Sequence, residues 1–185
     1  MGVNSGIKKQ LDIFGLLVVG VSCAIGGGIF RDLLVARMPY AISNIDYLIF
    51  AIVASILSVL LFQFRINIPK SLVSFFDTLG IGVFAAAGAV VALELNLSIF
   101  HCILFSILTA SGGGIIKDVL INEIPFILKR DLYATSAGLG GIIIYLVNYF
   151  SFNLELSVIF GVLSVVLFRL ISLRGNWHLP VIQEN

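Results

Sequence analysis

Two short segments place three glycines just ahead of a basic residue and an aspartate. Residues 26–39 read GGGIFRDLLVARMP, and residues 112–125 read GGGIIKDVLINEIP. At a constant offset of 86 they share seven of fourteen residues, among them the glycines, the aspartate and the final proline. Charged residues inside a membrane span commonly mark an ion or substrate pathway. The duplication indicates two related halves, each contributing one such segment.

The glycine triplets admit two interpretations. Each glycine in a helix costs about 1 kcal/mol relative to alanine. A break or kink at each triplet would free backbone carbonyls and amides to line a polar path. A flat glycine face would instead let two helices pack closely. We favour the kink because the feature occurs twice in symmetric places, and the two interpretations are compatible.

The charged residues after the triplets are candidates for a pathway lining or for snorkelling at helix ends. Because neighbours at i and i+1 point apart on a helix, we expect pairing between the halves, Arg31 with Asp118 or Lys117 with Asp32. The predicted pathway residues are Gly26, Gly27, Gly28, Arg31, Asp32, Gly112, Gly113, Gly114, Lys117 and Asp118.

Other chemical groups give weaker signals. Ser106, Thr109 and Ser111 approach the second triplet and are candidate pathway oxygens, although such hydroxyls more often bond back to their own helix. Cys23 and Cys102 have the character of small buried hydrophobes, with nothing to indicate a disulfide. The sequence holds no HExxH, GxSxG or P-loop pattern. We therefore expect no enzyme activity, no metal site and no cofactor.

The composition requires a membrane. Of the 185 residues, 59% are apolar and 11% are charged, with a mean hydropathy of +1.13. A soluble domain has about 25% charged residues, so this chain could not cover its surface in water. The net charge of +1 does not bear on nucleic-acid binding, but the sequence has no basic stripe with interleaved aromatics, so we expect none. A cleaved signal peptide is a weaker interpretation of the N-terminus, because its apolar run belongs to the repeat.

Six segments reach the length of about 20 apolar residues that a spanning helix needs. They are residues 13–34, 45–64, 75–95, 97–121, 132–152 and 154–173. Alternating the loops puts Arg31 and Arg37 on one side and the other nine basic residues on the opposite side. By the positive-inside rule the second side is cytoplasmic. We expect a multi-pass protein of the cell or inner membrane with a cytoplasmic C-terminus.

The repeat contains three spans, an odd number, so the second copy should be inverted relative to the first. The second copy has a full span before its glycine helix, whereas the first has only MGVNSGIKKQ, where residues 5–6 would answer residues 87–88. We expect that most of the first helix of repeat one is missing, as a misassigned start codon would cause. The expected organisation is one transmembrane domain over residues 1–185. Repeat one covers 1–70, repeat two covers 71–152, and a final helix with a short cytoplasmic tail covers 153–185.

The doubled GGGxx[RK]D segments, each followed by a proline, resemble the TRIC family (trimeric intracellular cation channels). They are most similar to bacterial and archaeal members, some of which are described as glycine transporters. The segments DIFG at 12–15 and DTLG at 77–80 are also similar to family segments at the starts of helices. Lys117 stands where bacterial relatives usually carry arginine, which keeps the charge but loses the planar fork.

The resemblance implies an all-α fold of seven helices, two inverted three-helix repeats plus a final helix, with about six full spans here. It also implies a homotrimer with a pore in each subunit, framed by the two glycine helices. Our first hypothesis is therefore a channel for monovalent cations, chiefly potassium. The second is a secondary transporter for glycine or a similar small amino acid, because basic residues beside a path do not by themselves favour cations. The third is a membrane scaffold without transport.

Overall fold

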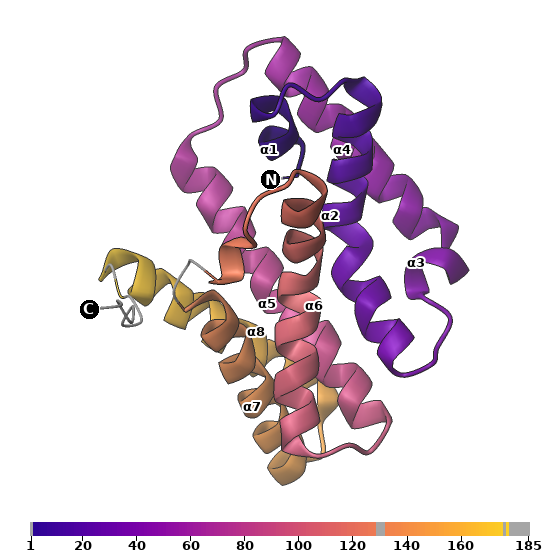
Figure 1. Ribbon diagram of the computed structural model, residues 1–185. Coiled ribbons are helices and arrows are strands. Elements are labelled where there is room, and N and C mark those ends of the chain that lie inside the picture. Colours follow the sequence, from indigo (N-terminus) through magenta and orange to yellow (C-terminus); the bar gives the residue numbers. More distant parts are fainter. Residues whose placement is uncertain (1, 129–131, 176, 178–185) are drawn as a thin grey trace, which may run out of the picture.

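The computed structural model describes residues 2–128, 132–175 and 177, and every regular element in those ranges is a helix (Figure 1). The long helices are α2 (Ile13–Leu34), α4 (Ile45–Gln63), α5 (Lys70–Glu94), α6 (Ile99–Leu120), α7 (Tyr133–Ser151) and α8 (Leu154–Arg174). The short ones are α1 (Gly2–Lys8), α3 (Tyr40–Ser43) and the 3₁₀ turn η1 (Phe126–Leu128). The six long helices are apolar and long enough to cross a membrane. The expectation of an all-α, multi-span fold is confirmed.

Local signals explain where the helices begin and end. Asp12 caps α2 by accepting a 2.7 Å hydrogen bond from the N–H of Gly15, which satisfies one of the free donors of the first turn. After α2 and α6 the chain turns through Ala36 and Asn122, at φ of 52° and 53°. A non-glycine residue in this left-handed region costs about 1–2 kcal/mol. These two lie 86 residues apart, so the repeat is also present in the backbone.

The predicted start of the third span is wrong. Helix α5 begins at Lys70 rather than at residue 75, because it includes a polar first turn after Pro69 that a count of apolar residues omits. The DTLG segment therefore lies inside α5, with Asp77 seven residues past the helix start. The other five predicted spans agree with the helices within two residues at each end.

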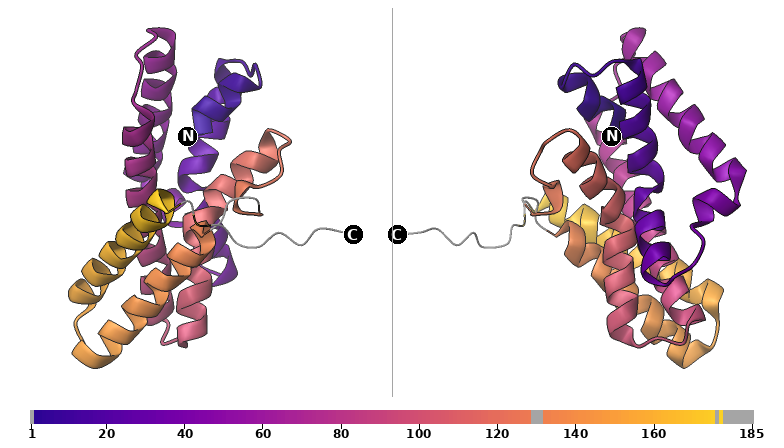
Figure 2. Two further views of the ribbon diagram at one scale, coloured as in Figure 1. Left: turned by 90° about the vertical axis from the view of Figure 1, so that its left-hand side faces the viewer. Right: turned by 45° about the vertical axis from the view of Figure 1, so that its right-hand side comes forward.

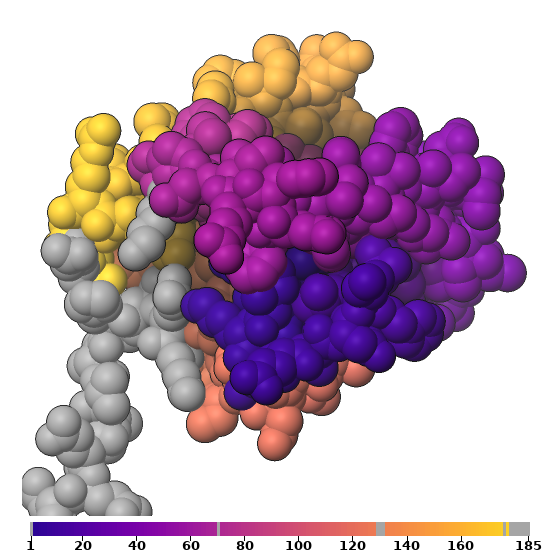
Figure 3. Space-filling view, turned by 90° about the horizontal axis from the view of Figure 1, so that it is seen from above, coloured from indigo at the N-terminus to yellow at the C-terminus, as the bar shows by residue number. Residues whose placement is uncertain are grey.

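The two glycine helices run in opposite directions. In Figure 1, α2 descends from the top of the molecule while α6 ascends beside it, and the second view of Figure 2 shows the same crossing. Helices α5 and α7 pack against α6, α8 packs against α5 and α7, and α4 packs against α2. Seen from above, α1 and the start of α2 lie between the α4–α5 connection and the end of α6 (Figure 3). The antiparallel pair is the inverted relationship that the odd number of spans predicts.

Small residues form the core, and large apolar ones face outward. Ala85, Ala89 and Ala137 have no exposed surface, whereas Phe14 and Phe150 are about three-quarters exposed, at 75% and 76%. Helices that associate in lipid gain little from burying large apolar side chains and pack closely through small ones. The outward phenylalanines suit contact with acyl chains.

Helix α1 corresponds to the last turns of α5, in a different register from the expected one. A Cβ at Gly2 would lie 2.9 Å from the carbonyl oxygen of Val19, and a Cβ at Gly88 would collide with the carbonyl of Phe105. Both members of the second pair lie 86 residues after those of the first. Gly2, and not the Ser5–Gly6 dipeptide, therefore answers Gly88, because the position that touches a neighbouring backbone is the one that requires glycine.

Candidate functional site

The glycine triplets form the contact between α2 and α6. A Cβ at Gly27 would collide with the carbonyl oxygen of Thr109, and a Cβ at Gly113 would collide with that of Cys23. Thr109 follows Cys23 by 86 residues, as Gly113 follows Gly27, so the contact is reciprocal about a local two-fold axis. Absent side chains let the two backbones touch, which is how small residues join membrane helices.

The structure shows no break in either glycine helix, and the expected kink at the triplets stays a prediction. Both α2 and α6 continue as α-helix through their three glycines to Leu34 and Leu120. The structure supports the packing interpretation, because the backbone carbonyls of these residues remain within continuous helices.

The third glycine of each triplet has different surroundings. No atom lies within 4 Å of the position of a Cβ at Gly28, which faces open space. A Cβ at Gly114 would collide with the ring of Phe126. The two halves therefore share their helix contact and differ in the space beside it.

The predicted pairing of charges between the halves is wrong. Arg31 pairs with Asp32, its Nε and Nη2 donating to Oδ1 at 2.8 and 2.7 Å, and Nη1 donating to the carbonyl oxygen of Ala87 at 3.3 Å. Lys117 Nζ lies 2.5 Å from Oδ1 of Asp118. Because α2 and α6 are antiparallel, their charged ends lie at opposite ends of the crossing. Each long basic side chain instead bends back to the carboxylate that follows it.

The second oxygen of each aspartate holds the loop after the glycine helix. Asp32 Oδ2 accepts the backbone N–H of Tyr40 at 2.9 Å, and Asp118 Oδ2 accepts that of Phe126 at 2.8 Å. Each donor follows a proline, and each ring makes an edge-to-face contact, Tyr40 with Tyr47 and Phe126 with Tyr133. One buried carboxylate therefore joins a helix end, a basic side chain and a loop.

Two exposed ion pairs brace these loops from outside. Arg37 Nη1 lies 3.0 Å from Glu94 Oε2, and Lys9 Nζ lies 3.1 Å from Glu123 Oε1. Arg37 and Glu123 lie 86 residues apart, and Lys9 and Glu94 miss that offset by one residue, so the two pairs occupy nearly equivalent places with opposite charge order. Each pair joins the loop after one glycine helix to the end of the helix that precedes the other glycine helix.

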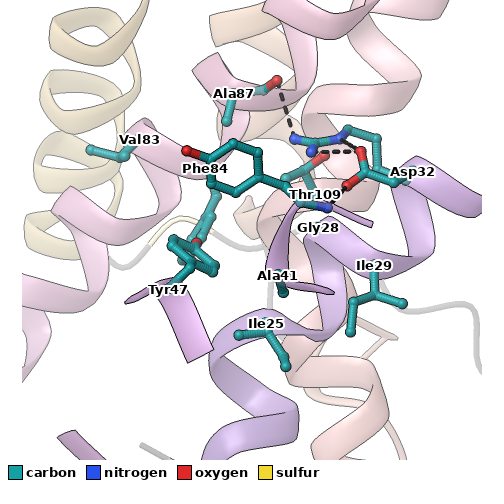
Figure 4. A pocket seen from close by; sticks show the side chains of 12 residues that line it. Ile25, Gly28, Ile29, Asp32, Ala41, Tyr47, Val83, Phe84, Ala87 and Thr109 are labelled. Carbon is teal, nitrogen blue, oxygen red and sulfur yellow. Dashed lines mark hydrogen bonds and ion pairs between the residues drawn. The ribbon is translucent and has the colours of Figure 1, made fainter. Parts of the chain in front are cut away.

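A pocket of about 330 Å³ lies beside the Arg31–Asp32 pair (Figure 4). Its wall comes from α2, α3, α4, α5 and α6, and half of its residues are apolar. The residues of polar or minimal side chain in the wall are Gly28, Arg31, Asp32, Tyr40, Tyr47 and Thr109. Of the predicted pathway residues, the structure brings three to this pocket. The predicted pathway residues of the second repeat do not line this pocket. In that repeat the ring of Phe126 fills the space beside Gly114.

The three hydroxyls that precede the second triplet are used differently. Ser106 donates to the carbonyl oxygen of Ala85 at 2.9 Å, and Ser111 donates to that of Ile107 at 2.6 Å. Thr109 is 3% exposed and lines the pocket, and its hydroxyl has no hydrogen-bond partner among the residues that the structure describes. The aromatic residues in the wall of the pocket were not predicted. The sequence held a signal for one of them, because Tyr47 corresponds to Tyr133 at the repeat offset.

Comparison with known proteins shows to which family this chain belongs. A family model described as "Glycine transporter" matches residues 1–63 and 74–149. The chain belongs to this family. The UPF0126 inner membrane protein YadS of Escherichia coli K12 is 36% identical over 97% of this chain and 87% of its own length. A UPF0126 membrane protein of Deinococcus radiodurans is 33% identical over 97% of this chain and 84% of its own.

Solved structures show the same fold. One, from a study of conductance through TRIC cation channels, has a TM-score of 0.94 and 32% identity, covering 100% of this chain and 91% of its own. A prokaryotic TRIC channel in 0.5 M KCl has a TM-score of 0.83 and 31% identity, covering 96% of this chain and 90% of its own. The TRIC orthologue of Rhodobacter sphaeroides has a TM-score of 0.82 and 30% identity, covering 95% and 91%. The resemblance to TRIC channels is confirmed, and this member of the glycine-transporter family is a multi-pass membrane protein of TRIC fold.

Proposed function

We propose that this protein is a channel for monovalent cations, chiefly potassium, with one pathway in each subunit of a homotrimer. The pathway runs past the α2–α6 crossing and through the pocket beside Arg31 and Asp32. Its proposed residues are the ten predicted ones, the two glycine triplets with their basic and acidic neighbours. Structural neighbours at 30–32% identity that are TRIC cation channels support the proposal.

The single observation that carries it is the place of the pocket on α2. The pocket touches Gly28 and Asp32, in the C-terminal part of the helix. A helix C-terminus carries about half a negative elementary charge, which attracts cations. The nearby guanidinium of Arg31 is neutralised by Asp32 at 2.7 Å, so it does not make the pocket a site for anions. The remaining apolar wall offers little to hold an ion, which suits rapid passage.

Carriage of glycine or a similar small amino acid is the second candidate. Arg31 has five N–H donors, and the three hydrogen bonds described above leave two of them for a carboxylate. The matching family description, "Glycine transporter", supports the same candidate.

Reconstitution of the purified protein in planar bilayers and liposomes tests both candidates. We expect single-channel current steps in a KCl gradient that reverse near the potassium equilibrium potential. Saturable uptake of labelled glycine without current would replace the channel with the carrier, and neither activity would overturn both. Light scattering of the detergent-solubilised protein, corrected for bound detergent, tests the homotrimer.

The proposed location is the inner membrane, with a cytoplasmic C-terminus. The lysines and arginines support this orientation, and the inner-membrane relative in Escherichia coli supports the location. A C-terminal fusion to a reporter that folds only in the cytoplasm should be active. An active periplasmic reporter would reverse the orientation.

A further inference from the structure

We infer that the hydroxyl of Thr109 is the specificity-determining oxygen for the permeating ion at the α2–α6 crossing, and that Cys23 is its two-fold equivalent on the other side. This inference rests on the proposed conduction pathway and names one of its ligands. The family comparisons do not assign this role to either residue.

The first observation is an unused buried hydroxyl. Threonine and serine in membrane helices usually donate to the carbonyl four residues earlier, as Ser55 and Thr78 do to Ala51 and Ser74. Thr109 does not, although it is 3% exposed and its Oγ1 has no partner among the described residues. Burying such a group without a partner is unfavourable. A buried hydroxyl in this state, on a residue that lines a pocket, would gain a partner if a water molecule or an ion reached it.

The second observation is where this hydroxyl lies. Thr109 lines the same pocket as Gly28 and the Arg31–Asp32 pair (Figure 4). The two charged side chains are occupied by each other, and Asp32 also accepts the N–H of Tyr40. The backbone of Thr109 is fixed because its carbonyl touches Gly27. A fixed hydroxyl oxygen is a suitable ligand for a hard alkali cation that has shed part of its water.

The third observation is the asymmetry of the two halves. The two-fold axis that relates the Gly27 contact to the Gly113 contact also relates Thr109 to Cys23. Cys23 is partly exposed and is a free thiol. A thiol is a soft, weak acceptor and a poor ligand for potassium or sodium. Only one half of the crossing therefore supplies a hard oxygen from this position.

Substitution tests the role in conduction. T109V keeps the shape and removes the oxygen, and we expect about tenfold lower potassium conductance, the effect of losing one hydrogen-bond-like contact to a charge. T109S should stay within about twofold of the wild type, and C23S should conduct better than the wild type. The matched control is T78V, because the Thr78 hydroxyl is buried and bonds within its own helix. Equal conductance of T109V, T78V and wild type would overturn the inference.

Cysteine accessibility tests the site without requiring current. In liposomes, T109C in a C23S/C102A background should react with a small charged thiol reagent added on one side. Native Cys23 in a C102A background should react from the opposite side, whereas Cys102, which is fully buried, should stay protected in a C23S background. A protected T109C, or reaction of both from one side, would overturn the inference. If the wild-type protein carries no current in bilayers but T109C reacts with the reagent, the channel is rejected and Thr109 is a hydrated site only. Conducting wild type with an unaffected T109V would reject the role of Thr109 alone.

Discussion

The backbone N–H of Tyr40 donates a 2.9 Å hydrogen bond to Oδ2 of Asp32, eight residues earlier in the chain. The other oxygen of the same carboxylate accepts the guanidinium of Arg31. One buried side chain therefore fixes both the last turn of α2 and the loop that covers the pocket. The second repeat has the same bond, from Phe126 to Asp118 at 2.8 Å.

Neutralising this carboxylate should destabilise the protein. D32N leaves the buried charge of Arg31 without a partner, which typically costs about 3–5 kcal/mol. We expect a matching loss in the free energy of unfolding, measured by denaturant unfolding in detergent micelles. D118N should have a similar effect through Lys117. D46N is the control, because Asp46 is exposed in the first turn of α4. A D32N protein as stable as D46N would show that the pair contributes nothing to folding.

Adding one methyl group at the crossing should separate the repeats. G27A and G113A each place a Cβ against a carbonyl oxygen, and overpacking of this kind costs about 1–3 kcal/mol. G28A, the neighbouring glycine, meets open space, and alanine is the better helix former by about 1 kcal/mol. Thermal unfolding should therefore rank G28A at or above wild type and the other two below it. Equal losses for all three would contradict the packing role of the triplet contact.

Truncating the ring of Phe126 should cost more than truncating its equivalent, Tyr40. Phe126 packs against the core beside Gly114, with its ring centroid 4.6 Å from that of Tyr133, whereas Tyr40 is 57% exposed. Removing a well-packed phenylalanine costs about 3–5 kcal/mol. F126A should lose that much stability and Y40A clearly less, as judged by unfolding midpoints. If Y40A lost more stability than F126A, then Tyr40 and not Phe126 would be the ring that packs tightly beside the crossing.

Exchanging the charges of an exposed pair should be nearly neutral. R37E sets two acids together at the Glu94 position and should lower stability by about 0.2–1 kcal/mol, the usual worth of an exposed ion pair. The double variant R37E/E94R should recover the loss, and 1 M salt should abolish the difference, because the screening length is then about 3 Å. Unfolding midpoints at low and high salt measure this. A double variant no better than R37E would mean that the two side chains do not interact.

The sequence predicted the fold because its strongest signals are geometric. Six long apolar runs set the spans, and the repeat of Gly27 at Gly113 set the inverted plan. The predictions that failed concern helix ends and register, which depend on the three-dimensional structure. Apolar counts miss the polar first turn of α5, so the position of Asp77 in the helix was wrong. The register of α1 followed from a backbone contact of Gly2 that no local pattern reveals.

Three of the predicted pathway residues line the pocket, whereas the predicted connections between the charged residues were wrong. The i, i+1 rule places the Cβ atoms of Arg31 and Asp32 apart, but it ignores the length of the arginine side chain. Of the two interpretations of the glycines, the structure shows the close packing of two helices. Thr109 was one of three candidate hydroxyls, and only the packing of α2 against α6 distinguishes it from Ser106 and Ser111.

The antiparallel crossing of α2 and α6 gives the two ends of the crossing the same electrical character. Each end receives the C-terminus of one glycine helix, with its partial negative charge, together with one basic and one acidic side chain. An ion that travels in either direction therefore meets nearly the same succession of potentials. The crossing itself should contribute little rectification, and any that it does contribute should originate where Cys23 replaces Thr109, where Phe126 replaces Tyr40 or where Lys117 replaces Arg31.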